Sequence, residues 1–546
     1  MFRPDTDLYL LKCPLEMDNN NQLTFANATA QFNYFNSLPK IELESSTYQR
    51  KDSTVRYAGN IENLYGYNYC MYRNHNYSNK WFYAYVTDLQ WANEQTTIVS
   101  LKTDVYQTWQ FDLSFKASFV EREHVNVDTV GAHTIPENLE LGEYVCNGIT
   151  EKEILSPSQN GTTGIIVIQV TTITLSDGSG TPASGLPIGA SVITGIPQGC
   201  YIIGVPFNSS NIVQLTAIIG YYDGVGKGDA IVSMYLAPYV ASQWTTANGT
   251  GTLSGETFYV PTETWSSSTF GSVNLSTPTT VNGYTPVNKK LLTAPYTYLY
   301  VTNNAGADVE YHYENFTNNA PSFTIYSTIE QGGSSFMMPT NSKVSTNNST
   351  TNNNGWSEGI PAPKLPILSW LSDYYLNWKA VNGSNIEIQA LGSAVNWGLS
   401  TAGILAGNGG GSYSTANLAS DVANIMQTIK EAKITPPQAR GNLNSGDVAF
   451  ASGKCKFTFR NMSIKQEYAE IIDKYFSAFG YRVNAFKLPN RTGRLNWNYV
   501  KTVGCNIEGD IPQADMQEIK GIFDSGVTLW HNPSTFLDYS QSNSIV

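Results

Sequence analysis

Charged residues are scarce in this chain of 546 residues, and basic ones are scarcer than acidic ones. Asp, Glu, Lys and Arg make up 14% of the sequence, with 32 basic and 44 acidic side chains and a formal net charge of −12. A protein that binds nucleic acid tightly needs basic side chains to replace the counterions of the phosphates. The composition therefore excludes tight DNA binding. It does not exclude DNA that passes along the protein, because an acidic wall repels phosphate and prevents adhesion.

Histidine and cysteine are also rare, and neither occurs in a pattern that supports catalysis or metal binding. The five histidines and six cysteines form no HExxH, HxH or CxxC motif, and the chain has no GxSxG motif and no P-loop. We therefore expect no enzyme activity, no catalytic residue, no metal ligand and no cofactor. The six cysteines are interpreted as reduced, mostly buried thiols of a protein made in a reducing cytoplasm. They are Cys13, Cys70, Cys146, Cys200, Cys455 and Cys505.

One short segment, FVEREHV at residues 119–125, brings two glutamates and a histidine together and so suggests an acid–base site. Side chains alternate between the two faces of a strand. Glu121 and Glu123 then lie on one face, with Arg122 and His124 on the other, so the two carboxylates and the imidazole do not share a site. We interpret the segment as surface charge at the end of a strand.

Aromatic residues are plentiful, with 34 Tyr, 22 Phe and 11 Trp. Residues 80–91 (KWFYAYVTDLQW) are aromatic-rich and extended. Apolar and polar residues then alternate from Thr97 to Val105 and again from Trp109 to Phe119, which predicts strands with one buried and one exposed face. Buried strands are also expected at 165–172, 200–205 and 231–239, and alternation returns over 296–340. The pattern predicts a mainly β protein with minor α content.

The C-terminal region mixes strands with two helices. A strand is expected at Lys454–Arg460, followed by a helix that Ser463 opens through a capping box with Gln466. The apolar face of this helix repeats at helical spacing, and Gly480 ends it. The remaining elements are expected as strands at 481–487, 495–502 and 527–530 and as a helix at 513–524.

The segment 386–437 departs from the β pattern. Residues 388–420 carry no charge, and Gly403 and Gly407 form a GxxxG motif that lets helices approach closely. An amphipathic helical face follows, and Pro436–Pro437 ends it. We interpret the segment as an inserted apolar helical hairpin or loop. Polar residues interrupt its first half, so a resident transmembrane helix is not expected. An ordinary buried hairpin or a glycine-rich loop is the alternative.

Several extended strings resemble the tail knob, or distal tail tube, proteins of phi29-type short-tailed phages. They are residues 79–90 (NKWFYAYVTDLQ), 104–112 (DVYQTWQFD), 119–125 (FVEREHV) and 498–532 (NYVKTVGCNIEGDIPQADMQEIKGIFDSGVTLWHN). The resemblance is close at both ends of the chain. Across 126–340 it is looser, with patches at 195–207 and 231–239.

The resemblance implies a structural virion protein with β-barrel, tube-like domains that assembles as a hexameric tube at the tip of the tail. The implied partners are five further copies, other tail and collar proteins, the phage double-stranded DNA that passes through the lumen without tight binding, and the host cell membrane on infection. A hydrophobic loop of each subunit plugs the tube in that family and emerges to form a membrane pore. The matching segment here is 386–437, which is shorter and less rich in Met and Ala than the family pattern. The residues expected to form the plug are Ala390, Leu391, Val395, Trp397, Leu399, Gly403, Ile404, Leu405 and Gly407.

We expect residues 1–125 and 440–546 to form one tail-tube β domain, 126–300 a distal β-rich domain, 301–385 a further β region and 386–437 the plug. The N-terminal sequence lacks the features of a signal peptide, so we expect assembly in the host bacterial cytoplasm and a final location at the tail tip of the virion. Two other functions remain open. A receptor-binding tail adhesin would contact cell-wall glycans through the loops at 245–290 and 341–355, and a cell-wall hydrolase would cleave peptidoglycan.

Overall fold

The computed structural model divides the chain into two compact units. Unit 1 comprises Met1–Tyr144, Thr279–Tyr296 and Ile464–Val546, and unit 2 comprises Val145–Pro278 and Thr297–Ser463. The structure describes residues 6–75, 79–155, 164–170, 201–206, 218, 230–240, 243–246, 252–253, 256–257, 259–261, 268–327, 335–343, 360–361 and 455–546. Both ends of the chain therefore contribute to unit 1. The domain limits expected from the sequence remain a prediction.

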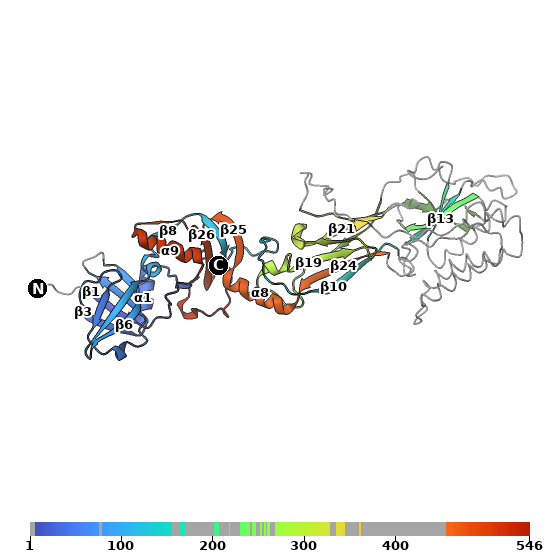
Figure 1. Cartoon of the computed structure of the whole chain (residues 1–546). Helices are drawn as coiled ribbons and strands as arrows, with labels where there is room; N and C mark the ends of the chain where they lie inside the picture. Colours follow the sequence, from blue (N-terminus) through green and yellow to red (C-terminus); the bar gives the residue numbers. More distant parts are fainter. Residues whose placement is uncertain are drawn as a thin grey trace, which may run out of the picture. The chain divides into compact units, whose positions relative to one another are not determined.

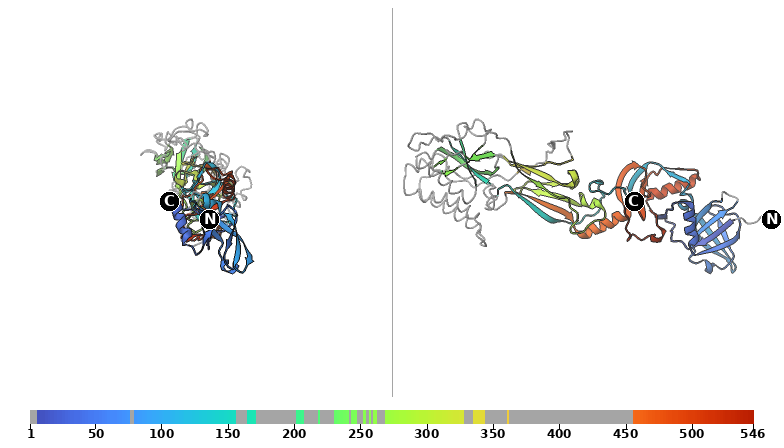
Figure 2. Two further views of the ribbon diagram at one scale, coloured as in Figure 1. Left: turned by 90° about the vertical axis from the view of Figure 1, so that its left-hand side faces the viewer. Right: turned by 180° about the vertical axis from the view of Figure 1, so that it is seen from behind.

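The first sheet of unit 1 is a six-stranded antiparallel sheet in the order β3-β1-β5-β6-β7-β4 (Figure 1; seen from behind in Figure 2). Its strands are β1 (Thr6–Leu11), β3 (Lys40–Ser46), β4 (Thr54–Tyr57), β5 (Tyr69–Asn74), β6 (Trp81–Asn93) and β7 (Thr96–Thr103). Helix α1 (Ala28–Ser37) packs on one face, where the Phe35 ring lies 5.4 Å from that of Tyr69 and 4.7 Å from that of Tyr83. The extended region at 80–91 and the alternation after Thr97 are confirmed.

The prediction of one strand from Trp109 to Phe119 is wrong. The chain forms helix α2 (Val105–Trp109), then a turn, then β8 (Leu113–Phe115) and β9 (Ser118–Glu123). The side chain of Asp104 accepts a hydrogen bond from the backbone N–H of Gln107 at 3.0 Å and so caps the helix. Alternation of apolar and polar residues does not reveal such a cap, because the cap depends on a single residue that precedes the alternating segment.

The second sheet of unit 1 joins both ends of the chain in the order β2-β28-β26-β9-β25. Its further strands are β2 (Asn21–Leu23), β25 (Tyr481–Lys487), β26 (Trp497–Val503) and β28 (Val527–Trp530). Helix α9 (Gln513–Ser525) shares an apolar core with β26 and β28, and β27 (Ile507–Gly509) pairs with β8. The predicted strands and helix of this region are confirmed, with shifts of one or two residues at their ends.

Helix α8 (Gln466–Phe479) ends at Gly480, whose φ of +64° suits glycine, as the sequence predicted. The predicted capping box is wrong, because Ser463 lies within β24 (Lys456–Ile464) and is paired with Thr297. Lys465 precedes the helix without a side-chain cap, and the N–H of Gln466 is bound instead by the Asn282 side chain at 3.3 Å. A residue distant in sequence thus replaces the local cap.

Unit 2 contains two four-stranded sheets that share an apolar core (Figure 1). The first has the order β10-β24-β19-β20, with β10 (Tyr144–Glu153), β19 (Thr297–Thr302) and β20 (Asp308–Tyr311). The second has the order β18-β21-β22-β23, with β18 (Ser268–Asn274), β21 (Ser322–Ser327), β22 (Phe336–Pro339) and β23 (Ile360–Pro361). Phe457 and Phe459 of the first sheet pack with Phe323 and Ile325 of the second, which makes a β-sandwich.

A third sheet of unit 2 has the order β13-β11-β12-β17-β14. Its strands are β11 (Gly164–Val170), β12 (Tyr201–Pro206), β13 (Ile231–Pro238), β14 (Trp244–Thr246) and β17 (Tyr259–Pro261), and β15 (Thr252–Leu253) pairs with β16 (Glu256–Thr257). Every residue of β11 is buried, as the apolar sequence IIVIQV predicts. The described residues thus confirm a mainly β protein with minor α content. The apolar segment 386–437 lies outside the described residues.

Candidate functional site

The nine residues expected to form the plug, from Ala390 to Gly407, lie outside the part of the chain that the structure describes. The plug therefore remains a prediction from the sequence. Within the described residues, no helix is long and apolar enough to cross a membrane. The described residues also contain no group of three or more His, Cys, Asp or Glu side chains placed to hold a metal ion.

The segment FVEREHV is not surface charge, so that interpretation is wrong for three of its four polar residues. Glu123, His124 and Arg122 are buried, while Glu121 stays half-exposed and pairs with Lys501 at 2.9 Å. Glu123 accepts hydrogen bonds from Lys487 Nζ at 2.5 Å and from the backbone N–H of Asn490 at 2.7 Å. The alternation assigned the faces of β9, but it did not show that β9 is an inner strand between β25 and β26.

His124 is a neutral structural residue. Its Nδ1 accepts from the backbone N–H of Tyr499 at 2.7 Å, which leaves Nε2 to donate to the carbonyl of Ser477 at 3.1 Å. Burial, with the nearby Arg494 charge, lowers the pKa of His124 to about 3. Neither ring nitrogen is free to exchange a proton with a substrate, so His124 does not form an acid–base site with Glu123.

Residues 126–143, which we call the strap, connect β9 to β10 without a helix or strand of their own. A connection of this length without regular structure is uncommon in a compact unit and needs specific contacts to hold it. Among residues 126–143, all of which the structure describes, Glu137 alone is buried. Leu139 and Leu141 pack partly buried against the neighbouring apolar core. The one deeply buried side chain of the strap is thus a carboxylate.

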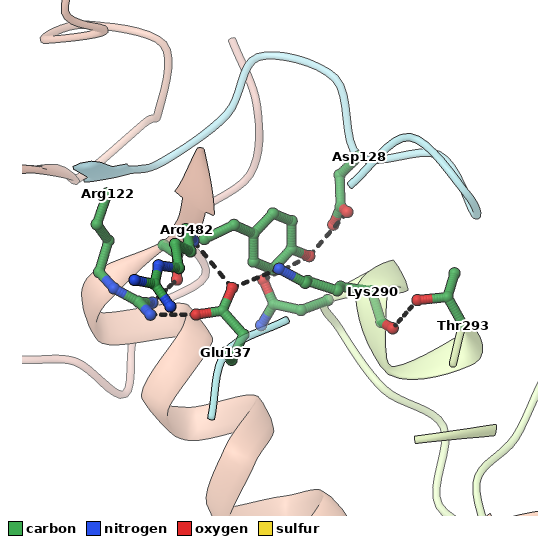
Figure 3. A network of polar contacts seen from close by, with 9 residues as sticks. Arg122, Asp128, Glu137, Lys290, Thr293 and Arg482 are labelled. Carbon is green, nitrogen blue, oxygen red and sulfur yellow. Dashed lines mark hydrogen bonds and ion pairs between the residues drawn. The ribbon is translucent and has the colours of Figure 1, made fainter. Parts of the chain in front are cut away.

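Glu137 lies between cations from two other chain segments (Figure 3). Its side chain is 0% exposed, that of Lys290 is 2% exposed and that of Arg122 is 11% exposed. Oε1 accepts from Lys290 Nζ and from the backbone N–H of Arg482 at 2.9 Å, and Oε2 accepts from Arg122 Nη2. Burial lowers the pKa of Lys290, while its contact with Glu137 opposes that shift. Strap, β9, β25 and the turn of η5 (Lys289–Leu292) thus meet at one carboxylate.

A second buried carboxylate, Asp473 of α8, holds the chain that precedes η5. It accepts from the backbone N–H of Val287 at 2.8 Å, from that of Asn288 at 3.0 Å and from the Tyr284 hydroxyl at 2.8 Å. The start of the strap is tied nearby, because Asp128 accepts from the Tyr481 hydroxyl at 2.8 Å (Figure 3). Because these carboxylates accept hydrogen bonds from donors of the protein itself, the arrangement holds chain segments together.

The strap leads into β10, which is an exposed edge strand of its sheet. Eight of the ten residues of β10 are exposed and two are half-buried, and Ile149 is 60% exposed. One side of β10 is paired with β24, and the strand order shows no strand on its other side among the described residues. A long exposed edge strand is a ready template for pairing with another chain. Sequence reasoning missed both features, since Glu137 belongs to no motif and YVCNGITEKE has no clear alternation.

Comparisons with known proteins identify the class to which this architecture belongs. Residues 5–114 match a family described as the N-terminus of the caudoviral major tail protein, and residues 262–544 match the C-terminal domain of tail knob protein gp9 of Bacillus phage phi29. The chain is therefore a structural protein of a phage tail. It belongs to the family of phi29-type tail knob proteins, because the second match covers more than half of the chain. The resemblance noted from the sequence is confirmed.

Similarity to members of this family extends over nearly the full chain. The tail knob protein gp9 of Bacillus phage PZA is 27% identical, and that of Bacillus phage phi29 is 26% identical; each comparison covers 98% of both chains. The solved structure of the tail knob protein gp12 of bacteriophage C1 superposes with a TM-score of 0.67 and covers 99% of this chain and 100% of that chain. At 17% identity this last likeness shows the fold alone.

Proposed function

We propose that this tail knob protein assembles as a hexameric tube that forms the distal conduit for genome ejection, with the 386–437 segments as its plug. The main observation in support of the proposed tube is the exposed edge of β10. Head-to-tail pairing of such edges in a closed ring removes them from solvent, and ring closure prevents open-ended growth. The opposite edge of the same sheet is β20, so a β10-to-β20 contact between neighbouring copies would continue the sheet around the ring.

The charge of the chain supports a conduit. With 44 acidic against 32 basic residues, the protein offers phosphate few cations, so DNA can pass without adhesion. The plug rests on the uncharged run at 388–420 and on the resemblance to the family. We further propose that the domains follow the limits expected from the sequence and that the protein contacts other tail and collar proteins. We also propose that the plug is released toward the host membrane and that the protein assembles in the host cytoplasm.

A single substitution in β10 tests the tube. Ile149 is 60% exposed within one copy, so Ile149→Lys should leave the monomer folded but place a charge in the proposed contact. Wild-type protein should form six-fold rings in electron-microscopy class averages and a hexamer by light scattering, and Ile149→Lys should shift it to monomers. Val287→Lys is the matched control, because Val287 is 72% exposed and lies outside β10; this variant should still form rings. A wild-type monomer at all concentrations, with no rings in virions, would contradict the proposal.

A further inference from the structure

Residues 541–546, which we call the added strand, lie along residues 493–497 within unit 1. The two segments form an antiparallel β-bridge that is flanked by two backbone hydrogen bonds. In one of these the N–H of Leu495 donates to the carbonyl of Ser544 at 3.0 Å. Such pairing of an extended segment with another piece of backbone is also a way in which proteins bind extended peptides. Residues 493–497 therefore form a site that recognises an extended chain.

This site makes most of its contacts to one residue of the added strand, Asn543. The side-chain Oδ1 accepts from the backbone N–H groups of Asn496 at 2.9 Å and Trp497 at 3.1 Å, and Nδ2 donates to the carbonyl of Trp497 at 2.8 Å. The backbone carbonyl of Asn543 accepts from Arg494 Nη1 at 3.3 Å. Because the site uses both the acceptor and the donor of the amide, it selects asparagine over an aspartate or an apolar side chain.

The remainder of the added strand is held loosely. Asn543 is half-buried, whereas the other five residues are exposed, and Val546 is 81% exposed. The aromatic contacts end before the strand, at Tyr539, whose ring lies 5.2 Å from that of Trp497 and 5.0 Å from that of Trp530. A segment with little buried apolar surface and exposed hydrogen bonds opens at a low free-energy cost. The added strand can therefore leave its site while unit 1 stays folded.

We propose that the added strand is exchangeable, and that the site at 493–497 takes the same segment of a second copy of this chain in the assembled ring. Exchange of an identical element replaces each contact with an equal one, so it links copies at little cost. In an isolated copy the short connection from Tyr539 keeps the added strand beside its own site. A neighbouring copy competes only where assembly holds copies together, so this setting rests on the proposed hexameric tube.

Hydrogen exchange at the amide of Leu495 tests the anchor within one copy. The acceptor of this amide is the backbone carbonyl of Ser544, so replacement of the Asn543 side chain does not remove it directly. In Asn543→Ala the added strand should detach more often, and the Leu495 amide should exchange at least about 10-fold faster than in the wild type. Ser544→Ala is the matched control, because alanine retains the carbonyl, and its exchange rate should equal that of the wild type. Equal rates in Asn543→Ala and the wild type would overturn the anchor.

Cysteine cross-linking between two co-expressed chains tests exchange. Leu495 and Ser544 are exposed and lie opposite each other beside the bridge, at a spacing that suits a disulfide. One chain carries Leu495→Cys and the other Ser544→Cys, both with the exposed Cys146 replaced by serine. Oxidation should give at least about 10-fold more cross-linked chain pairs from the mixture than from either variant alone. Addition of Asn543→Ala to the Ser544→Cys chain should reduce this yield.

The cross-linking result and the ring count are read separately. No cross-linked pairs above the single-variant background would overturn exchange, even if electron microscopy shows rings. In that case Leu495→Cys/Ser544→Cys on one chain should give a disulfide within the chain alone. Cross-linked pairs without six-fold rings would support exchange between copies and contradict the proposed hexameric tube.

Discussion

The carboxylate of Asp473 binds Asn288 twice, through the backbone N–H at 3.0 Å and through the side-chain amide at 2.8 Å. Asn288 Nδ2 also reaches the hydroxyl of Ser477 at 2.8 Å, one helical turn further along α8. This pair holds the segment before η5 against the helix. Several donors, including the two buried ones of Asn288, therefore depend on one carboxylate.

Replacing Asp473 should destabilise unit 1 strongly. Asp473→Ala leaves the donors of Tyr284, Val287 and Asn288 unsatisfied, and we expect the free energy of unfolding of unit 1 to fall by about 3 kcal/mol or more. Urea titration followed by tryptophan fluorescence measures the change. Asp538→Ala is the control, because Asp538 lies at the surface and, among the described residues, its carboxylate accepts hydrogen bonds from Ser540 and Gln541, its neighbours in sequence, so its effect should be much smaller. Equal effects of the two variants would contradict the buried role of Asp473.

Acid should weaken unit 1 through two histidines. Burial lowers the pKa of His124 to about 3 and that of His531 to about 4, whereas an unfolded histidine titrates near the ordinary value of 6.5. The unfolded state therefore binds more protons below pH 6.5, and stability should fall as the pH drops from 6.5 toward 4. Thermal midpoints measured across this range should decline less steeply in His531→Asn than in the wild type. An unchanged slope would show that His531 does not contribute.

Asp104 should act in the opposite direction. Burial raises its pKa to about 6, against an ordinary value of 3.8, although it accepts hydrogen bonds from Tyr69 and Gln107. The folded state binds more protons between pH 4 and 6, so the contribution of Asp104 is full at low pH and is lost as the pH rises through 6, by about 3 kcal/mol. Asp104→Asn keeps the cap and should remove this part of the pH dependence. Matching stability profiles for variant and wild type would refute the assignment.

A charged substitution in the plug segment should distinguish a loop that lies in the lumen from a segment of the ordinary core. A charge near the centre of a membrane helix costs about 2.5–3.5 kcal/mol. Ile404→Asp should therefore leave ring assembly intact but reduce dye release from liposomes, and deletion of 386–437 should abolish it. Ile404→Leu is the conservative control and should release dye from liposomes to the same extent as the wild type. Equal leakage from all variants, or loss of rings in Ile404→Asp, would reject the plug.

Bare DNA should bind weakly. Since the chain carries a net charge of −12, filter binding at about 50 mM salt should show nothing tighter than the ~10⁻⁴–10⁻⁶ M of non-specific sites. Binding should also lack sequence preference. A nanomolar complex would mean that basic side chains gather on one surface despite the overall balance.

The sequence alone determined the features that depend on local pattern. Alternation from Thr97 predicted a half-buried strand, and Thr97, Val99, Leu101 and Thr103 are indeed its buried side. Gly480 ends α8 because only glycine adopts its left-handed conformation without strain. Long strings such as 498–532 are specific enough to indicate the family, which the family match confirms. Each of these signals is carried by residues adjacent in sequence.

Only the tertiary structure decided which polar residues are buried. Glu137, Lys290 and Arg122 come from three separate segments and belong to no motif, and they meet because the strap, η5 and β9 are brought together by folding. The same holds for Glu123, which alternation placed on a face but could not show to be covered. Asn282 replaces the predicted cap of α8 for this reason as well. The period of a sequence pattern shows on which face of a strand or helix a residue lies. Whether that residue is buried and hydrogen-bonded depends on the other segment that packs against the face.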